Sequence, residues 1–100
     1  MSRVLIERKL FDVAQRLKRA REQLAVIDEQ LAVMADAADE ARIRSLVSET
    51  PLANREYADA QRHADAMDRS RRVVAAEVAE LQVTQDELLD RLISEDTSRS

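Results

Sequence analysis

The 100-residue chain contains no cysteine, no glycine and no tryptophan, and it has one proline, one tyrosine and one phenylalanine. Without cysteine it has neither a disulfide framework nor a thiolate metal site. Without glycine a phosphate-cradling loop is excluded, because such loops need the backbone conformations that glycine supplies. A compact globule needs turns and bulky core residues, and this chain has few of either.

Long apolar runs are missing as well. No stretch approaches the roughly 20 apolar residues that a membrane span needs. Val4-Leu5-Ile6 is too short to form the apolar part of a signal peptide, and charges of both signs flank it. The net charge of −4 argues against generic binding to nucleic acid. We therefore expect a soluble, cytoplasmic protein without membrane contacts.

Residues for catalysis or metal binding are equally scarce. His63 is the only histidine, and Asp59 shares its face of a helix, but one histidine among scattered carboxylates does not predict a metal site. No serine has a histidine to activate it, and two helices enclose no pocket that excludes water. We expect no enzymatic activity, no cofactor, no metal and no small-molecule substrate.

Two heptad ladders, one in each half of the chain, are the main positive feature. Apolar residues recur at alternating three- and four-residue steps, which is the a/d seam of a coiled coil. In the first half the ladder holds Arg3, Ile6, Leu10, Val13, Leu17, Ala20, Leu24, Ile27, Leu31, Met34, Ala38 and Ala41. In the second half it holds Tyr57, Ala60, Ala64, Met67, Arg71, Val74, Val78, Leu81, Gln85, Leu88, Leu92 and Glu95.

A turn between the ladders completes an all-α hairpin. Ser2 and Thr50 are suitable N-caps, with Asn54 as an alternative to Thr50, and Pro51 fits the first position of a helix. We predict a single helical-hairpin domain over 1–100. Its expected elements are a helix over about 3–47, a turn over about 48–50, a second helix over about 51–95 and a frayed tail over 96–100.

The distribution of charge predicts that the two helices run antiparallel. Residues 1–21 carry seven basic and two acidic groups, a net +5, and residues 22–41 carry six acidic groups and no basic one, a net −6. Residues 42–72 carry seven basic and five acidic groups, a net +2, and residues 73–100 carry two basic and seven acidic groups, a net −5. Folding back sets opposite charges against each other, which selects an orientation but contributes little stability.

The ladders allow two registers of pairing. If paired residue numbers sum to 98, Arg3 lies opposite Glu95, although Asp28 then lies near Asp68. A sum of 105 also gives apolar layers, but it needs a turn of about seven residues and brings more like charges together; we favour 98. Arg71 is a polar seam residue that either fixes the register or turns outward to join a basic patch.

Some residues are not needed to form the hairpin, and these are the candidates for function. Apolar side chains off the ladders gather near the turn and near the chain ends, where no third helix covers them, and exposed apolar clusters usually mark interfaces. The alternative is local packing around the turn and the ends. The candidate partner-binding residues are Ile43, Leu46, Val47, Glu49, Leu52, Arg55 and Tyr57 at the turn, and Leu5, Phe11, Leu89 and Ile93 at the ends.

Clusters of basic residues are the second candidate. The simplest interpretation is that Arg16, Lys18, Arg19 and Arg21 pair with carboxylates of the second helix. The other is that they contact phosphate groups of structured RNA, together with Arg69 and Arg72. No aromatic residues accompany them, so stacking on single-stranded bases is not expected.

These observations favour a non-enzymatic module that docks on a larger protein assembly through its turn, its chain ends or both, as a regulatory or accessory subunit. The alternatives are an RNA- or ribosome-associated factor and a homo-oligomer that builds a four-helix bundle. In architecture alone, a hairpin with an elaborated tip resembles the coiled-coil arms of transcript-cleavage factors, which suggests the transcription machinery as one such assembly. Those arms hold magnesium with a close acidic pair, whereas Glu49 and Glu56 are seven residues apart and Arg55 lies between them.

Overall fold

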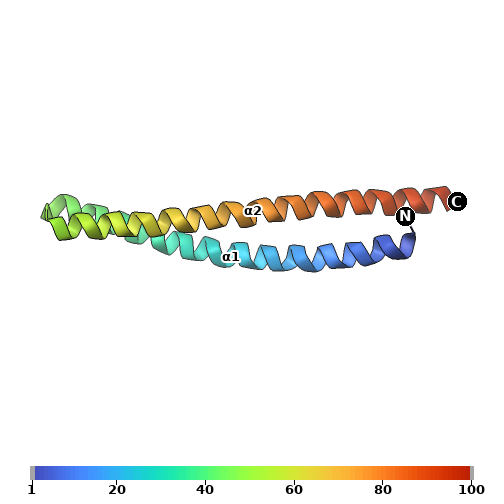
Figure 1. The fold of residues 1–100 in the computed structure, drawn as a ribbon, viewed down its shortest axis with the longest axis horizontal. Coiled ribbons are helices and arrows are strands. Elements are labelled where there is room, and N and C mark those ends of the chain that lie inside the picture. The colour runs from blue at the N-terminus through green and yellow to red at the C-terminus, as the bar shows by residue number, and fades with distance from the viewer. Residues whose placement is uncertain (1, 100) are drawn as a thin grey trace. The chain divides into compact units, whose positions relative to one another are not determined.

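The computed structural model describes residues 2–99, apart from the side chain of Arg99. Helix α1 (Arg3–Ser48) and helix α2 (Pro51–Arg99) are joined by the two residues Glu49 and Thr50 (Figure 1). No strand occurs within that part of the chain. Both predicted helix starts are confirmed, and α1 ends one residue later than expected.

The end of α2 differs from the prediction. The helix continues to Arg99, four residues beyond the end expected near Glu95, so the expected tail is helical through residue 99. The hydroxyls of Thr97 and Ser98 donate to backbone carbonyls one turn earlier, at 2.9 and 3.0 Å. These hydroxyls therefore have hydrogen-bond partners within the helix. Ser100 lies outside the described residues.

The chain divides into two compact units, and each takes a segment from both helices. Unit 1 consists of Met1–Gln23 and Val74–Ser100, and unit 2 is Leu24–Val73. In unit 1 the beginning of α1 packs antiparallel to the end of α2, and in unit 2 the end of α1 packs antiparallel to the beginning of α2 (Figure 1). The predicted all-α antiparallel coiled-coil hairpin is confirmed.

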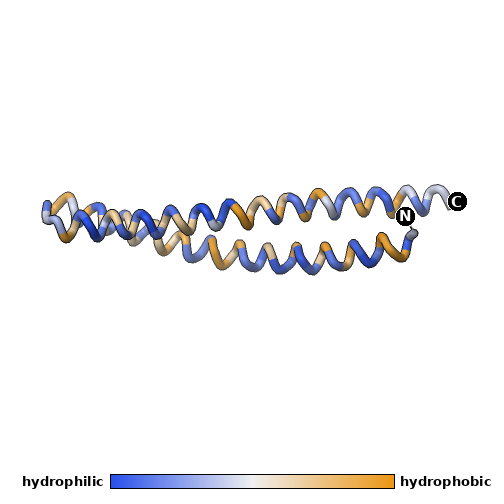
Figure 2. The backbone as a smooth tube through the Cα atoms, viewed as in Figure 1, coloured by the Kyte–Doolittle hydropathy of each residue, from blue (hydrophilic) through white to orange (hydrophobic). Residues whose placement is uncertain are grey.

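The two ladders form the packed seam. Every ladder position predicted from the sequence is buried or half-buried, whereas most other positions are exposed. Figure 2 shows the matching alternation of apolar and polar segments along both helices. The core of unit 1 contains Ile6, Val13, Leu17, Ala20, Leu81 and Leu88, with Leu10, Val78 and Leu92 packed against it. The large aliphatic side chains of this core make unit 1 a conventional coiled-coil pair.

An ion pair between the helices fixes the register in each unit. In unit 1 the guanidinium of Arg3 pairs with Asp96, one residue beyond its expected partner Glu95. In unit 2 the Arg71 Nε lies 2.6 Å from the Asp28 Oδ1. Both pairs have residue numbers that sum to 99, which agrees with the favoured sum of 98 and excludes 105.

Arg71 turns toward the facing helix and does not join an outward basic patch. Arg71 pairs with Asp28, and Asp68 pairs with Arg72 at 2.8 Å within α2. The two acidic residues that the register brings near each other thus have one arginine each. A polar seam residue of this kind selects the register, because no other alignment gives it the same partner.

Arg3 connects two carboxylates of unit 1. Its Nε donates to the Glu7 Oε1 of α1 at 2.9 Å, and a second guanidinium nitrogen donates to the Asp96 carboxylate of α2. The hydrogen bond to Glu7 and the charge of Asp96 raise the pKa of Arg3 above its usual value. The side chain is 42% exposed, so the contact orients the helices more than it stabilises them.

Candidate protein-interaction surface at the turn

The turn is closed by a short set of backbone and capping contacts. Glu49 adopts a left-handed backbone conformation with φ of 51°, and its N–H donates to the Ser45 carbonyl at 3.1 Å. This is the αL motif that terminates a helix and satisfies one of its last carbonyls. The Thr50 Oγ1 accepts from the Ala53 N–H at 3.1 Å, and Pro51 occupies the first helical position. Thr50 is therefore the N-cap, as predicted.

The seam next to the turn is built from small residues. Ala38, Ala41, Ser45 and Ala53 are all at least 92% buried, and the Ser45 hydroxyl donates to the Arg42 carbonyl at 2.7 Å. Ser45 and Ala53 continue the two ladders by one heptad beyond the positions assigned from the sequence. Small side chains at a helix contact allow a shorter distance between the helix axes.

The large apolar side chains of this region lie outside the seam. Ile43, Leu46, Val47 and Leu52 are exposed to 56%, 65%, 80% and 60%, respectively. Three of them come from the last two turns of α1, and Leu52 comes from the first turn of α2. The predicted apolar cluster is therefore exposed on both sides of the turn. We call these four residues the turn patch.

The polar residues predicted to accompany the turn patch occupy two different environments. Glu49 and Arg55 are exposed, and no ion pair involves either of them in residues 2–99. Tyr57 is half-buried at its ladder position. Its ring is therefore partly used in the seam, and it presents less surface to a partner than the residues of the turn patch.

The apolar residues predicted near the chain ends are exposed in unit 1. Leu5, Phe11, Leu89 and Ile93 are exposed to 44%, 65%, 42% and 63%. Phe11 lines a shallow hollow of about 380 Å³ on α1, but the other three do not. These residues are thus available to a partner, yet the structure does not gather them into one pocket.

The predicted basic residues are exposed but do not form one surface. Arg16, Lys18, Arg19 and Arg21 make none of the ion pairs with α2 that the sequence suggested, as far as the described residues go. At about 100° per residue these four positions spread around the helix. Arg69 is likewise exposed and outside any such pair, whereas Arg72 binds Asp68.

Four exposed valines were missed in the sequence. Val26, Val33, Val73 and Val83 are exposed to between 52% and 70%. Val33 lines a hollow of about 440 Å³ in unit 2, together with Glu29, Gln30, Met34 and Met67. Val26 and Val33 are seven residues apart and lie off the ladder, and this spacing could have indicated a second apolar stripe on α1.

Comparison with known proteins adds no assignment. None of the family models matches the chain, and the searches of curated proteins and of solved structures likewise give no match. Over the described residues, no three histidine or carboxylate side chains are grouped so that they could hold a metal ion, and Asp59 pairs with Arg62. Neither helix, over those residues, has a segment long and apolar enough to cross a membrane.

Proposed function

We propose that this chain is a non-enzymatic coiled-coil module that binds a protein partner through its turn patch. It would act as an accessory or regulatory subunit of a larger cytoplasmic assembly, of which the transcription machinery is one candidate. The proposal rests on the environment of the side chains at the turn and on no likeness to another protein.

The main observation behind the proposal is that, at the turn, the small side chains are buried and the large apolar ones are exposed. The seam there is built from alanine and serine, while isoleucine, leucine and valine of the same helical turns are more than half exposed. Folding alone favours the opposite arrangement, because burying a leucine side chain contributes about 1.5–3 kcal/mol. Exposed large apolar residues that gather at one place are typical of protein interfaces.

The surroundings of the turn patch indicate the kind of partner surface. Arg42, Arg44 and Arg55 are exposed beside it, and none of them has a carboxylate partner within residues 2–99. A complementary surface would hold an apolar pocket for Leu46 and Val47 with carboxylates at its rim. The apolar residues would carry the affinity, and the arginines would orient the partner.

The test replaces part of the turn patch without touching the seam. We expect the double substitution Leu46→Ser and Val47→Ser to keep full helicity by circular dichroism and to abolish recovery of the partner by the tagged chain. The matched control is Val26→Ser with Val33→Ser, which removes a similar amount of exposed apolar surface elsewhere on α1. Equal recovery of the partner by both double variants and the parent chain would reject the proposal.

Two further measurements separate this function from its alternatives. Binding through an apolar patch persists at high salt, whereas binding to RNA phosphates weakens steeply with salt. Self-association into a four-helix bundle would give the mass of a dimer in light scattering. The Leu46→Ser, Val47→Ser variant would then have the mass of a monomer. Loss of the partner at high salt would favour RNA binding. A dimer in the absence of other proteins would favour the four-helix bundle.

A further inference from the structure

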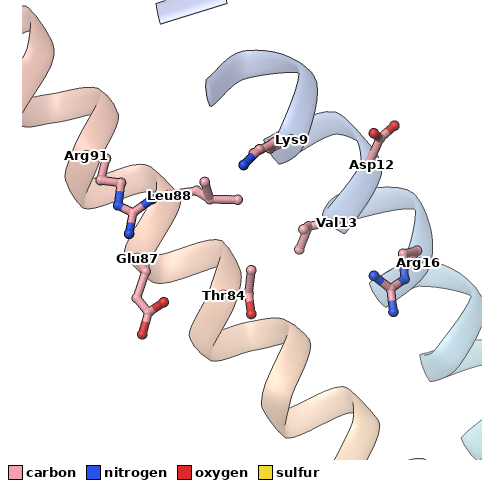
Figure 3. Close-up of a pocket in the computed structure, with 8 residues that line it drawn as sticks. All are labelled: Lys9, Asp12, Val13, Arg16, Thr84, Glu87, Leu88 and Arg91. Carbon is pink, nitrogen blue, oxygen red and sulfur yellow. The ribbon is translucent and has the colours of Figure 1, made fainter. Parts of the chain in front are cut away.

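A cleft runs between the two helices of unit 1, away from the turn patch. It has a volume of about 310 Å³. Helix α1 contributes Lys9, Asp12, Val13 and Arg16, and α2 contributes Thr84, Glu87, Leu88 and Arg91 (Figure 3). Val13 and Leu88 belong to the seam and form its floor, so the charged residues stand along its edges.

The cleft brings cations of both helices to the same edge of the seam. Lys9 of α1 and Arg91 of α2 line the same cleft from its two sides, and Arg16 and Thr84 line it one heptad further along. Like charges at facing edge positions repel each other and destabilise a coiled coil. The arrangement is therefore unfavourable for the hairpin alone.

The cations of the cleft lie outside the ion pairs of residues 2–99. Lys9, Arg16 and Arg91 form no ion pair with any acidic group of the described chain. The two acidic residues at the cleft do not turn into it: Figure 3 shows the Asp12 carboxylate directed away from α2 and the Glu87 carboxylate directed away from α1. The cleft therefore carries three positive and two negative charges, and among the described residues its three cations have no carboxylate within ion-pair distance.

We propose that this cleft binds a phosphate group. A phosphate dianion is compact, carries several acceptor oxygens and matches the planar donors of arginine, so it can engage Lys9, Arg16 and Arg91 at once. The Thr84 hydroxyl donates to the Glu80 carbonyl at 3.0 Å, so recognition falls to the three cations. Bound phosphate would link α1 to α2 and remove the repulsion between them.

The site is tested by titrating the whole chain with inorganic phosphate at constant ionic strength, followed by backbone amide NMR shifts. We expect saturable shifts at the residues that line the cleft. Substituting Lys9→Gln or Arg91→Gln should weaken the affinity about tenfold, as expected for the loss of a charge-assisted hydrogen bond. Lys9→Arg should bind as the parent chain does.

The matched control is Lys18→Gln, which makes the same change of charge on α1 outside the cleft and should alter the affinity less than twofold. Shifts that do not saturate, or an equal loss with Lys18→Gln, would overturn the site in favour of diffuse attraction. Because the turn patch is not involved, the Leu46→Ser, Val47→Ser variant should bind phosphate normally even if the proposed function fails.

Two further titrations identify the class of phosphorylated ligand. Inorganic pyrophosphate and a short RNA duplex are titrated under the same conditions with the same variants. Tighter binding of pyrophosphate than of the duplex indicates a small phosphorylated ligand, and the reverse indicates a nucleic acid backbone. Either result retains the site, provided that Lys9→Gln and Arg91→Gln weaken the binding.

Discussion

Glu49 has a positive φ, the only such backbone angle among the residues described. A side chain with a Cβ is strained there, because the Cβ approaches the following carbonyl oxygen, and the cost is about 1 kcal/mol. Glycine usually occupies this position after a helix, but the chain contains none. The structure therefore keeps a small amount of strain at its turn.

Relief of this strain can be measured. We expect Glu49→Gly to raise the free energy of unfolding by about 0.5–1 kcal/mol, since glycine adopts the left-handed conformation without the Cβ contact. Glu49→Ala retains the Cβ and serves as the control, with no gain expected. The measurement is urea unfolding followed by circular dichroism. A gain of the same size with alanine would show that the glutamate charge, and not the backbone, is unfavourable.

A second test at the residue scale concerns the N-cap of α2. The Thr50 Oγ1 accepts the Ala53 N–H, which has no partner earlier in the helix. Thr50→Ala should therefore lower the free energy of unfolding by about 1 kcal/mol, whereas Thr50→Ser, which keeps the hydroxyl, should lie close to the parent chain. If serine is as damaging as alanine, the packing of the threonine methyl group matters more than the cap.

At the scale of the helix, stability should depend on the seam and not on the outer faces. Leu17 is 2% exposed in the core of unit 1, whereas Leu46 is 65% exposed. We expect Leu17→Ala to reduce the free energy of unfolding by about 2–5 kcal/mol, through lost burial and a residual cavity. The same chemical change at Leu46 should stay within about 0.5 kcal/mol. Thermal unfolding of both variants checks this, and a large loss at Leu46 would show that the turn patch is already covered.

The helices could be predicted closely because heptad spacing and capping are local properties of the sequence. The ladders identified the seam, and Thr50 with Pro51 identified the start of α2. The register could not be determined from the sequence alone, because two alignments of the ladders were possible and only one was favoured. The contact between Asp28 and Arg71, which are distant in the sequence, decides between them. Helix α2 extends beyond its predicted end, which could not be foreseen because a short polar segment near a terminus carries no local signal that distinguishes a last helical turn from a frayed tail.

The candidate site was predictable only in part. Ile43, Leu46, Val47 and Leu52 could be recognised as exposed, because they lie off the ladder. The cleft of unit 1 could not, since it depends on Lys9 and Arg91, which are 82 residues apart and face each other only in one register. The ion pairs expected for Arg16 to Arg21 are absent from residues 2–99 for a similar reason. Segments of opposite net charge can lie side by side without their individual side chains coming within ion-pair distance.

At the scale of the whole molecule, the two units differ in the size of their buried side chains. Unit 1 buries Ile6, Leu17, Leu81 and Leu88, whereas four of the five buried apolar residues of unit 2 are alanines. The exception is Ile27. Less apolar area is therefore removed from water in unit 2, and its local stability should be lower.

Hydrogen exchange tests this difference directly. We expect the backbone amides of residues 28–66 to exchange faster than those of residues 6–20 and 78–92, because opening unit 2 exposes less apolar surface. Replacing Ala38 by leucine would not reverse the order, because Ala38 is 4% exposed and a larger side chain would overpack the seam. Uniform protection in both units would mean that the chain opens only as a whole.

The two-residue linker also limits how this protein can change in length. One inserted residue would turn the following helix by about 100° and move its ladder out of contact with α1. Insertions or deletions that preserve pairing must therefore come in steps of seven residues, with one step in each helix. Chains that descend from the same ancestor should differ by multiples of about fourteen residues, while the two-residue linker of Glu49 and Thr50 stays the same length.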